Sequence, residues 1–347
     1  MRICYITLKG EIKVLGGIQR YAEEVISRIK DICDVDVVRV KPKLKHMRAI
    51  TEVPLKVLMK KCDVYHATIP TLALTLPLIK RRNTIVTFHD ITPFFAYRYK
   101  FFKPHVRLLG KFYVKLFWKD IIAERSKAII VPSSQTKEDL VNIFGIDEDK
   151  IFVIPHGVSD KFRDLGLDRK YITFCANFSK RKRVDIAVKV YKELLKIMDN
   201  PPKLVLAGGS FKSVHQGFFN VRELIRGIED HVIVLPSLGD EELIKLYNQS
   251  IVYLFPSDYE SFGFPIIEAA RCGTIPIVRE EAKITREVKE VALVAKTDEI
   301  PYIIYELLND KRKWEKIRKK CYEKSLKFRW EDSVRKHLEV YELVAKR

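Results

Sequence analysis

The chain has 347 residues and carries 64 Lys and Arg against 45 Asp and Glu, a formal net charge of +19 at pH 7. With 47% hydrophobic residues, 14 Gly and 15 Pro, the composition excludes a disordered chain, a collagen-like fibre and low-complexity sequence. The length is about twice that of a usual domain and favours two folded domains, and the surplus of positive charge indicates a polyanionic partner such as nucleic acid or an acidic lipid surface.

Short apolar runs rich in β-branched residues alternate with helical patterns along most of the chain. In the first half the predicted strands are 3–8, 35–40, 63–68, 84–90, 128–134 and 151–155. In the second half they are 171–177, 203–209, 232–237, 251–257 and 274–280. Continuous apolar strands separated by helices are typical of parallel sheets covered on both faces. The sequence therefore predicts an α/β protein with two Rossmann-like, doubly wound domains.

The stretch between the two series of strands, residues 159–170, has the weakest pattern. We therefore expect a first domain over 1–165 and a second over 166–325, followed by a C-terminal helix over 326–347 that crosses back to the first domain. Loops at the carboxyl ends of parallel strands gather into a crevice. The residues that carry chemistry are expected there, in a cleft between two facing domains.

The six scattered cysteines show no metal-ligand spacing and are typical of small buried residues in a reducing compartment. Lys9 and Glu11 interrupt the first apolar run, so we interpret it as a strand and not a secretory leader. The sequence contains no uninterrupted run of about 18 apolar residues, so it predicts no membrane-spanning helix. These features predict a cytoplasmic protein, and attachment to a membrane surface stays open.

The strongest local signal is the segment 260–268, which follows the predicted strand 251–257 and opens a helix. A helix N-terminus presents unpaired N–H groups and partial positive charge, and Gly263 allows an anion to approach the backbone closely. Glu260 lies before the helix, and Glu268 lies about two turns later. The spacing equally fits a Glu260 favoured by the helix dipole and a Glu268 at the surface.

These residues resemble the signature of retaining glycosyltransferases of the GT-B fold, in the large family that contains sucrose synthases and bacterial and archaeal mannosyltransferases. The resemblance rests on two glutamates seven residues apart, with Ser261, Phe262 and Gly263 after the first. Other segments resemble the same family in the same order: Gly16-Gly17-Ile18 with Tyr21, 87–90, 131–134 with Asp139 and Leu140, 154–158, Arg181-Lys182 with Asp185, and 328–333. Ala176 departs from the family's usual Gly, and Arg183 departs from the Asn of one variant.

The resemblance implies a nucleotide-sugar site on the second domain. Arg181 and Lys182 would stabilise the departing diphosphate, although four consecutive basic residues, 180–183, also fit a solvated charge run. The sugar and the ribose would contact Glu260 and Glu268, respectively. The remaining residues implied for the donor are Ser261, the backbone N–H groups of Phe262, Gly263 and Phe264, the closely approaching Gly16 and Gly17, and, by position alone, Ser237 and Leu238 near the base.

On the first domain, the resemblance implies that His89 hydrogen-bonds the donor sugar near the reacting carbon, with Asp90 orienting it or contacting the acceptor. Without the resemblance, a lone His after a strand is more often structural. The family retains anomeric configuration by same-face attack and needs no obligatory metal. We interpret the Asp-x-Asp strings at 34–36 and 147–149 as a strand entry and a polar loop and not as metal sites.

Much of the positive charge lies in one part of the chain. Residues 41–125 hold 18 Lys or Arg against 5 Asp or Glu, and residues 98–119 hold seven basic residues and no acidic one. Within that segment basic residues recur every four positions: Lys103, Arg107, Lys111, Lys115 and Lys119. This pattern favours a basic amphipathic helix on an anionic membrane over nucleic-acid binding. A core-packing helix with a solvated lysine face stays open.

The sequence therefore predicts a retaining transferase that moves a hexose, mannose or glucose, from a GDP- or UDP-sugar to a lipid-linked or membrane-surface glycan. We expect the enzyme to be cytoplasmic and peripheral at the inner face of the cell membrane. The alternative is a basic nucleic-acid-binding protein that keeps the two-domain fold without transfer activity.

Overall fold

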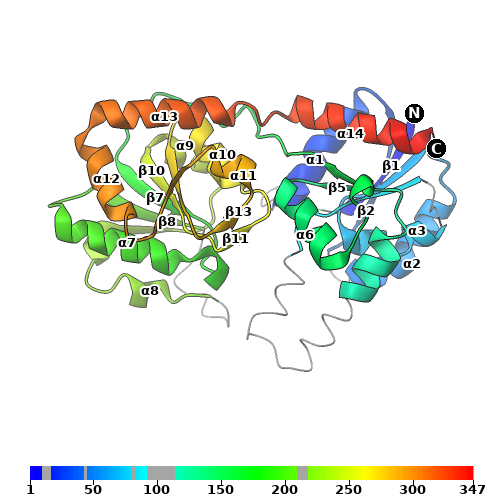
Figure 1. Ribbon diagram of the computed structural model, residues 1–347, viewed down its shortest axis with the longest axis horizontal. Helices are drawn as coiled ribbons and strands as arrows, with labels where there is room; N and C mark the ends of the chain where they lie inside the picture. The colour runs from blue at the N-terminus through cyan, green and yellow to red at the C-terminus, as the bar shows by residue number, and fades with distance from the viewer. Residues whose placement is uncertain (10–16, 43–44, 80–82, 92–113, 209–217, 347) are drawn as a thin grey trace. The chain divides into compact units, whose positions relative to one another are not determined.

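The structure is a computed structural model that describes residues 1–9, 17–42, 45–79, 83–91, 114–208 and 218–346. The chain forms two compact units (Figure 1): the first comprises Met1–Gly157 with Arg329–Arg347, and the second comprises Val158–Phe328. The boundaries expected from the sequence, 165/166 and 325/326, stay predictions about separately folding domains. The contacts of the chain divide it at 157/158 and 328/329.

The first unit is built on a six-stranded parallel sheet of order β2-β1-β3-β4-β5-β6. Its strands are β1 (Arg2–Leu8), β2 (Asp34–Val40), β3 (Val64–Ala67), β4 (Thr84–Thr87), β5 (Ala128–Val131) and β6 (Ile151–Val153). The inner strands β3, β4 and β5 are buried at every position, as their unbroken apolar sequence requires. All six strands predicted for the first half of the chain are confirmed.

Helices cover this sheet. Their apolar residues recur at helical spacing, so each helix has one apolar face that packs against the sheet. In α1, for example, the buried residues include Tyr21, Val25 and Ile29. The N-cap of α6 is Ser133, whose hydroxyl accepts a hydrogen bond from the Thr136 N–H at 3.3 Å. The helices are α1 (Gly17–Lys30), α2 (Lys45–Leu58), α3 (Leu76–Ile79), α6 (Ser134–Phe144) and α14 (Trp330–Ala345), with 3₁₀ turns at Pro70–Ala73 and Glu148–Lys150 and a π-helix at Val114–Ala123.

The second unit is built on another six-stranded parallel sheet, of order β14-β12-β10-β7-β8-β9. Its strands are β7 (Tyr171–Cys175), β8 (Lys203–Ala207), β9 (Val232–Leu235), β10 (Ser250–Phe255), β12 (Ile275–Arg279) and β14 (Leu293–Ala295); β11 (Tyr259–Glu260) and β13 (Lys283–Ile284) form a small separate ladder. The five strands predicted for the second half are confirmed. The short strands β11, β13 and β14 were not predicted, since two or three residues carry no periodic signal.

The second sheet is covered by helices whose apolar faces form one large core with it. In α7, Val184, Ala187, Val188, Tyr191 and Leu194 are buried. The helices are α7 (Val184–Ile197), α8 (Val221–Leu224), α9 (Asp240–Asn248), α10 (Phe264–Arg271), α11 (Arg286–Lys289), α12 (Ile300–Asn309) and α13 (Lys311–Ser325), with 3₁₀ turns at Lys180–Lys182 and Glu229–His231. Among the described residues, no helix combines the length and the apolar character needed to cross a bilayer.

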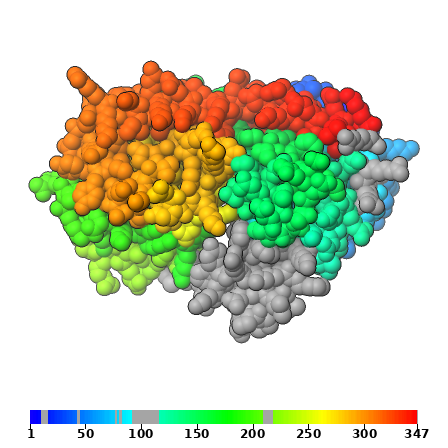
Figure 2. Space-filling view, in the orientation of Figure 1, coloured from blue at the N-terminus to red at the C-terminus, as the bar shows by residue number. Residues whose placement is uncertain are grey.

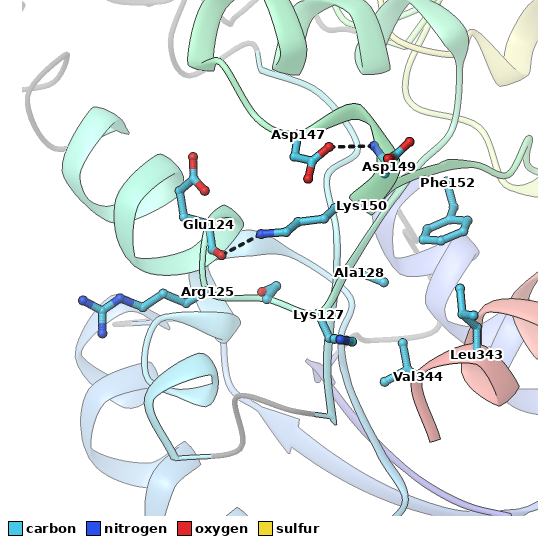
Figure 3. Close-up of a pocket in the computed structure, with 11 residues that line it drawn as sticks. Glu124, Arg125, Lys127, Ala128, Asp147, Asp149, Lys150, Phe152, Leu343 and Val344 are labelled. Carbon is cyan, nitrogen blue, oxygen red and sulfur yellow. Dashed lines mark hydrogen bonds between the residues drawn. The ribbon is translucent and has the colours of Figure 1, made fainter. Parts of the chain in front are cut away.

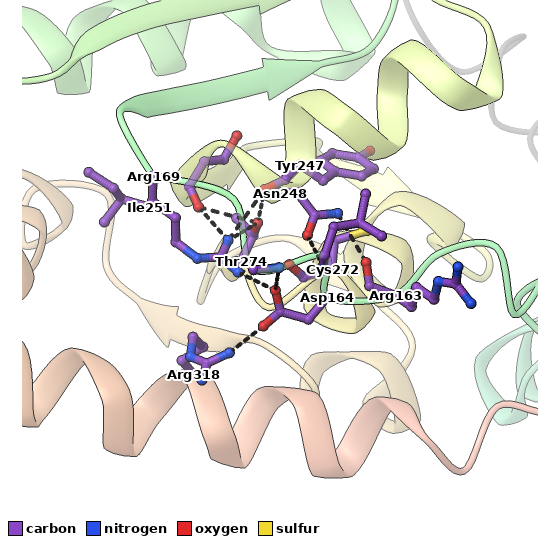
Figure 4. A network of polar contacts seen from close by, with 12 residues as sticks. Arg163, Asp164, Arg169, Tyr247, Asn248, Ile251, Cys272, Thr274 and Arg318 are labelled. Atoms are coloured by element: carbon purple, nitrogen blue, oxygen red, sulfur yellow. Dashed lines mark hydrogen bonds and ion pairs between the residues drawn. The ribbon is translucent and has the colours of Figure 1, made fainter.

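The stretch 159–170 is fastened to the second unit by a polar network around Arg169 (Figure 4). The Arg169 guanidinium donates to the carbonyl oxygens of Ser250 and Cys272, each at 2.9 Å, and pairs with Asp164 at 3.2 Å. Arg318 of α13 pairs with the same Asp164 at 2.6 Å. One carboxylate and one guanidinium therefore join this stretch to a strand, a turn and a helix of the second unit.

A close backbone approach fixes the start of α14 in the first unit. A Cβ atom added to Gly157 would lie 2.3 Å from the Trp330 nitrogen, a contact that no side chain tolerates. The rings of His156 and Trp330 stack with centroids 6.1 Å apart. His156, Gly157 and Trp330 lie far apart in sequence but meet here, and this contact gives His156 a structural role in the first unit.

Candidate functional site

Each sheet has one point at which its strand order reverses, and ligands of open α/β sheets bind at the carboxyl ends of the strands there. In the first unit β1 lies between β2 and β3, so the reversal falls between β1 and β3. In the second unit it falls between β7 and β10. Arg181 and Lys182 follow β7, and Glu260 follows β10, so the fold brings these candidates to the reversal point of the second unit.

Glu260 and the two cations form one compact cluster. The Glu260 Oε1 atom accepts a hydrogen bond from Arg181 Nη1 at 2.6 Å and another from the Lys182 ammonium. Arg181 also donates to the Tyr259 carbonyl oxygen at 2.8 Å. The Glu260 and Lys182 side chains are 14% and 13% exposed, whereas Arg181 is 37% exposed. These positions exclude a merely solvated run for Lys182 and leave the outer face of the Arg181 guanidinium accessible.

Burial and charge act in opposite directions on this cluster. Burial by itself raises the pKa of the Glu260 carboxyl, but the positive charges of Lys182 and Arg181 outweigh it and hold that pKa below its ordinary value. Burial lowers the pKa of the Lys182 ammonium, and the charge of Glu260 opposes this shift. The carboxylate is therefore ionised at neutral pH and holds the two cations in place.

Further ion pairs around Arg183, to which the sequence motifs give no role, fix the turn that carries these cations. Arg183 adopts the left-handed backbone conformation with φ 55°, and its guanidinium pairs with Asp185 at 3.1 Å and with Asp258 at 3.0 Å. Arg279, whose side chain is buried, also pairs with Asp258. The Asp258 N–H donates to the Arg181 carbonyl oxygen at 3.0 Å. The sequence offered one signal for this turn: Arg183 stands where a variant of the family has Asn. Asn tolerates the left-handed conformation better than most residues do.

Gly263 precedes the first turn of α10 with φ 93°, a conformation that L side chains rarely adopt. A Cβ atom there would also lie 3.2 Å from Ile266. Phe262 is buried, and its ring packs edge-on against Phe264 with centroids 5.0 Å apart. Ser261 is half-buried. The segment is thus a rigid turn at the N-terminus of an eight-residue helix, where backbone N–H groups and the helix dipole favour an anion.

Glu268 lies on α10 and is 3% exposed, so the alternative that it is a surface glutamate is wrong. Its charge raises the pKa of the neighbouring Cys175 thiol, after the larger effect of burial. Ser237 is exposed and Leu238 half-buried, directly after β9. Gly208, which the sequence analysis did not assign, has φ 109° after β8. The Leu235 carbonyl oxygen accepts its N–H at 3.3 Å, so the carboxyl ends of β8 and β9 are tied together.

In the first unit, His89 follows β4 and is 8% exposed. Its Nε2 atom lies 2.9 Å from the Thr68 carbonyl oxygen, which can only accept, so Nε2 carries the proton and Nδ1 is left as an acceptor. Burial lowers the pKa of His89 to about 4, and the ring is neutral at pH 7. Asp90 is half-buried beside it, and Gly17 is exposed at the start of α1. Gly16 lies outside the described residues.

The Asp-x-Asp strings lie away from both reversal points. Asp36 pairs with Arg2 at 2.9 Å and with Lys60 at 2.7 Å. Asp147 and Asp149 line a cavity of about 500 Å³ at the amino ends of β5 and β6 (Figure 3). His89 follows the carboxyl end of β4, at the opposite edge of the sheet. Lys150 reaches the Glu124 carbonyl oxygen at 3.1 Å there. In the ranges that the structure describes, no group of three or more His, Cys, Asp or Glu side chains is arranged to hold a metal ion.

The basic segment 98–119 lies largely outside the described residues. Its last part falls in the π-helix Val114–Ala123, where Trp118 is buried against Phe88 with ring centroids 5.6 Å apart. Lys119 is half-buried. The proposed membrane contact of Lys103, Arg107, Lys111 and Lys115 therefore stays a prediction.

Comparisons with known proteins find relatives of both halves of the chain. The family described as "Glycosyl transferases group 1" matches residues 159–325, and "Glycosyltransferase Family 4" matches residues 15–162. A D-inositol 3-phosphate glycosyltransferase of Acidothermus cellulolyticus is 28% identical over 244 residues, 64% of this chain and 54% of that protein. The serotype-specific mannosyltransferase WbdA of Escherichia coli is 23% identical over 274 residues, 73% of this chain and 32% of that protein. The chain thus spans about half of the first relative and a third of the second.

Among solved structures, Anabaena Alr3699/HepE in complex with UDP-glucose is similar with a TM-score of 0.75 and 14% identity, covering 99% of this chain and 99% of that chain. A likeness at that identity concerns the fold, and the predicted GT-B class, with two Rossmann-like sheets and a C-terminal helix, is confirmed. Two matching family profiles in order, over residues 15–162 and 159–325, account for most of the sequence. The chain belongs to glycosyltransferase family 4.

Proposed function

We propose that the protein is a retaining glycosyltransferase that moves a hexose from a nucleoside diphosphate sugar to a glycan acceptor. The observation that carries the proposal is the cluster of Arg181, Lys182 and Glu260 at the strand-order reversal of the second unit. This is the edge at which open α/β sheets bind nucleotides. A buried carboxylate there holds two cations beside a helix N-terminus.

The chemistry of donor cleavage fits these charges. As the glycosidic bond breaks, negative charge accumulates on the departing diphosphate, and donors fixed before the reaction stabilise it without reorganising. Arg181 offers its exposed guanidinium face, Lys182 adds a second positive charge, and the turn at Gly263 adds backbone N–H groups. We propose that these groups neutralise the diphosphate and that no metal ion is obligatory.

The remaining candidates take complementary roles in the proposal. Glu260 orients the two cations and contacts hydroxyls of the transferred sugar, and Glu268 accepts from the ribose. His89, neutral and with Nδ1 as an acceptor, receives a hydrogen bond from a hydroxyl of the sugar and so orients the reacting carbon. Asp90 orients His89 or contacts the acceptor. The other donor contacts proposed are Gly16, Gly17, Ser237, Leu238, Ser261, Phe262 and Phe264.

The proposal also names a class of donor and a class of acceptor. UDP-glucose in the Anabaena structure and the mannosyl transfer in the name of WbdA support glucose or mannose from a UDP or GDP donor. We propose a lipid-linked or membrane-surface glycan as the acceptor, because the basic segment 98–119 suits an anionic membrane. We therefore also propose that the enzyme is cytoplasmic and peripheral at the inner face of the cell membrane.

Replacement of the central carboxylate tests the site. In Glu260→Gln, the two cations lose the charge that orients them, so turnover of a nucleotide sugar is expected to fall by about 10²-fold or more. Nucleotide sugars are first screened by thermal shift and by donor hydrolysis, and kcat and KM are then measured for the donor that responds. Glu241→Gln, an exposed glutamate of α9, is the matched control and should retain wild-type kinetics.

Arg181→Gln separates binding from folding. It should raise the KM for the donor and weaken binding of the nucleoside diphosphate alone, while circular dichroism and the melting temperature stay close to those of the control. Wild-type turnover in either site variant would remove the proposed site. Binding of RNA with no response to any nucleotide sugar would favour the nucleic-acid alternative.

A further inference from the structure

Helix α13 of the second unit carries a stripe of like charges. Four basic residues follow one another at intervals of four and so lie along one slowly drifting side of the helix: Arg312, Lys316, Lys320 and Lys324. The two glutamates of the helix pair elsewhere, Glu315 with Arg318 at 3.0 Å and Glu323 with Lys319 at 3.9 Å. Like charges four residues apart destabilise a helix. The stripe therefore indicates an anionic partner that compensates this repulsion.

The stripe ends at a cavity of about 440 Å³, within the range of roughly 300–1,000 Å³ that small-molecule sites occupy. Its apolar, mainly aliphatic lining comes from α13, from the edge strand β14 and from the residue before that strand: Ala292, Leu293, Val294, Ile317 and Cys321. Val294 is 44% exposed, so this apolar surface is open to solvent. In Figure 2, the orange atoms of α12 and α13 belong to the exposed surface of this unit.

The rim of the cavity is positively charged. The cations that line it are Arg286, Lys289, Lys320 and Lys324. Glu290 is the carboxylate among the lining residues, and it is already neutralised by Lys327 at 3.2 Å and Arg286 at 3.9 Å. In the described part of the chain, Lys320 and Lys324 form no ion pair. The described lining of the cavity thus carries four cations against one carboxylate, an excess of positive charge beside an apolar surface.

We propose that this cavity, with the α13 stripe beside it, binds the headgroup of an anionic membrane lipid. Lys320 and Lys324 contact the lipid phosphate, and the upper part of an acyl chain covers Val294 and Ile317. An aliphatic floor suits an acyl chain, whereas single-stranded nucleic acid is bound through aromatic stacking, and no aromatic side chain lines this cavity among the described residues. The site differs from the segment 98–119 and does not depend on sugar transfer.

Vesicle flotation of the full chain tests the proposal. The wild type should bind vesicles of phosphatidylglycerol and phosphatidylcholine and should bind pure phosphatidylcholine poorly. Each cation near an anionic surface contributes about fivefold, so Lys320→Gln with Lys324→Gln should weaken binding by roughly 25-fold. Val294→Ser, which leaves the charge unchanged, should weaken it severalfold. Lys189→Gln with Lys245→Gln, two exposed helical lysines of the same unit, removes the same charge and should have no such effect.

Three results would overturn the lipid site. One is wild-type vesicle binding by the Lys320 and Lys324 double variant, which would assign binding to another surface such as 98–119. Another is equal binding of both vesicle types. The third is an unchanged Val294→Ser variant together with parallel loss of vesicle and polyuridylate binding in the double variant, which would show a general polyanion patch. All variants are first matched in melting temperature.

Discussion

Individual residues in rare backbone conformations position the candidate donor site. Gly263 with φ 93° turns the chain into α10, and Gly208 with φ 109° ends β8. Arg183 reaches the left-handed region although it carries a side chain, and its pairs with Asp185 and Asp258 hold it there. Arg183 directly follows Arg181 and Lys182, so its left-handed conformation helps to set the direction of the turn that carries them.

Gly208→Ala should destabilise the second unit. Its Cβ atom would lie 2.7 Å from the Ala176 carbonyl oxygen, and the left-handed conformation alone costs a side chain about 1–2 kcal/mol. Gly227→Ala is the matched control, because Gly227 has φ 83° and no atom within 4 Å of the added Cβ. Chemical denaturation of both variants should show a clearly larger loss for Gly208→Ala. Equal losses would mean that conformation alone, and not the contact with Ala176, makes this glycine necessary.

At the scale of elements, α14 is joined to the sheet of the first unit by a buried polar network. The Tyr21 hydroxyl contacts His337 Nε2 at 2.8 Å and the Thr87 hydroxyl at 2.9 Å. His66 joins Thr87 at 2.7 Å to the Tyr341 hydroxyl at 2.7 Å. Each of these buried side chains forms a hydrogen bond with another member of the network. The network therefore specifies one position of α14 on the sheet.

This network predicts a loss of stability in acid. Burial lowers the pKa of His337 to about 4, against an ordinary value of 6.5 in the unfolded chain. Between pH 6.5 and pH 4 the unfolded chain therefore binds a proton at His337 that the folded chain does not bind. The stabilisation is present above pH 6.5 and is lost as the pH falls towards 4. At pH 5, His337 alone should contribute a loss of about 2 kcal/mol.

Thermal unfolding at pH 7.5 and pH 5 measures this effect. The melting temperature of the wild type should fall more steeply between these conditions than that of His337→Gln, which keeps a hydrogen-bonding group but does not titrate. His231→Gln, in the second unit, should follow the wild type. Parallel pH dependence in wild type and His337→Gln would show that the buried imidazole does not determine the acid response.

At the scale of the whole molecule, chain order and spatial order differ. The last segment, Arg329–Arg347, belongs to the first unit although the whole second unit precedes it in sequence. It buries Trp330, Val334, Val340, Tyr341 and Val344 there. The stability of the first unit therefore depends on residues that follow the second.

Deletion of residues 329–347 should consequently destabilise the first unit and leave the second nearly unchanged. Hydrogen exchange resolved along the sequence is the measurement: protection should fall in β1, β3 and α1, and it should persist in β7, β8 and α7. Trp330→Ala in the full chain should give the same pattern more weakly, through a loss of about 3–5 kcal/mol. Uniform loss of protection in both units would contradict the division of the chain.

The sequence by itself determined the class of fold and the positions of the main strands along the chain. A buried parallel strand needs an unbroken apolar run, and each such run can be recognised from its own residues. It also indicated Arg181, Lys182, Glu260 and His89 through local motifs. Only the tertiary structure decided which of these meet. The Arg181, Lys182 and Glu260 contacts, and the supporting Arg183 and Asp258 pair, join residues more than seventy positions apart. No local pattern encodes such pairing, since it follows from the order of strands in the sheet.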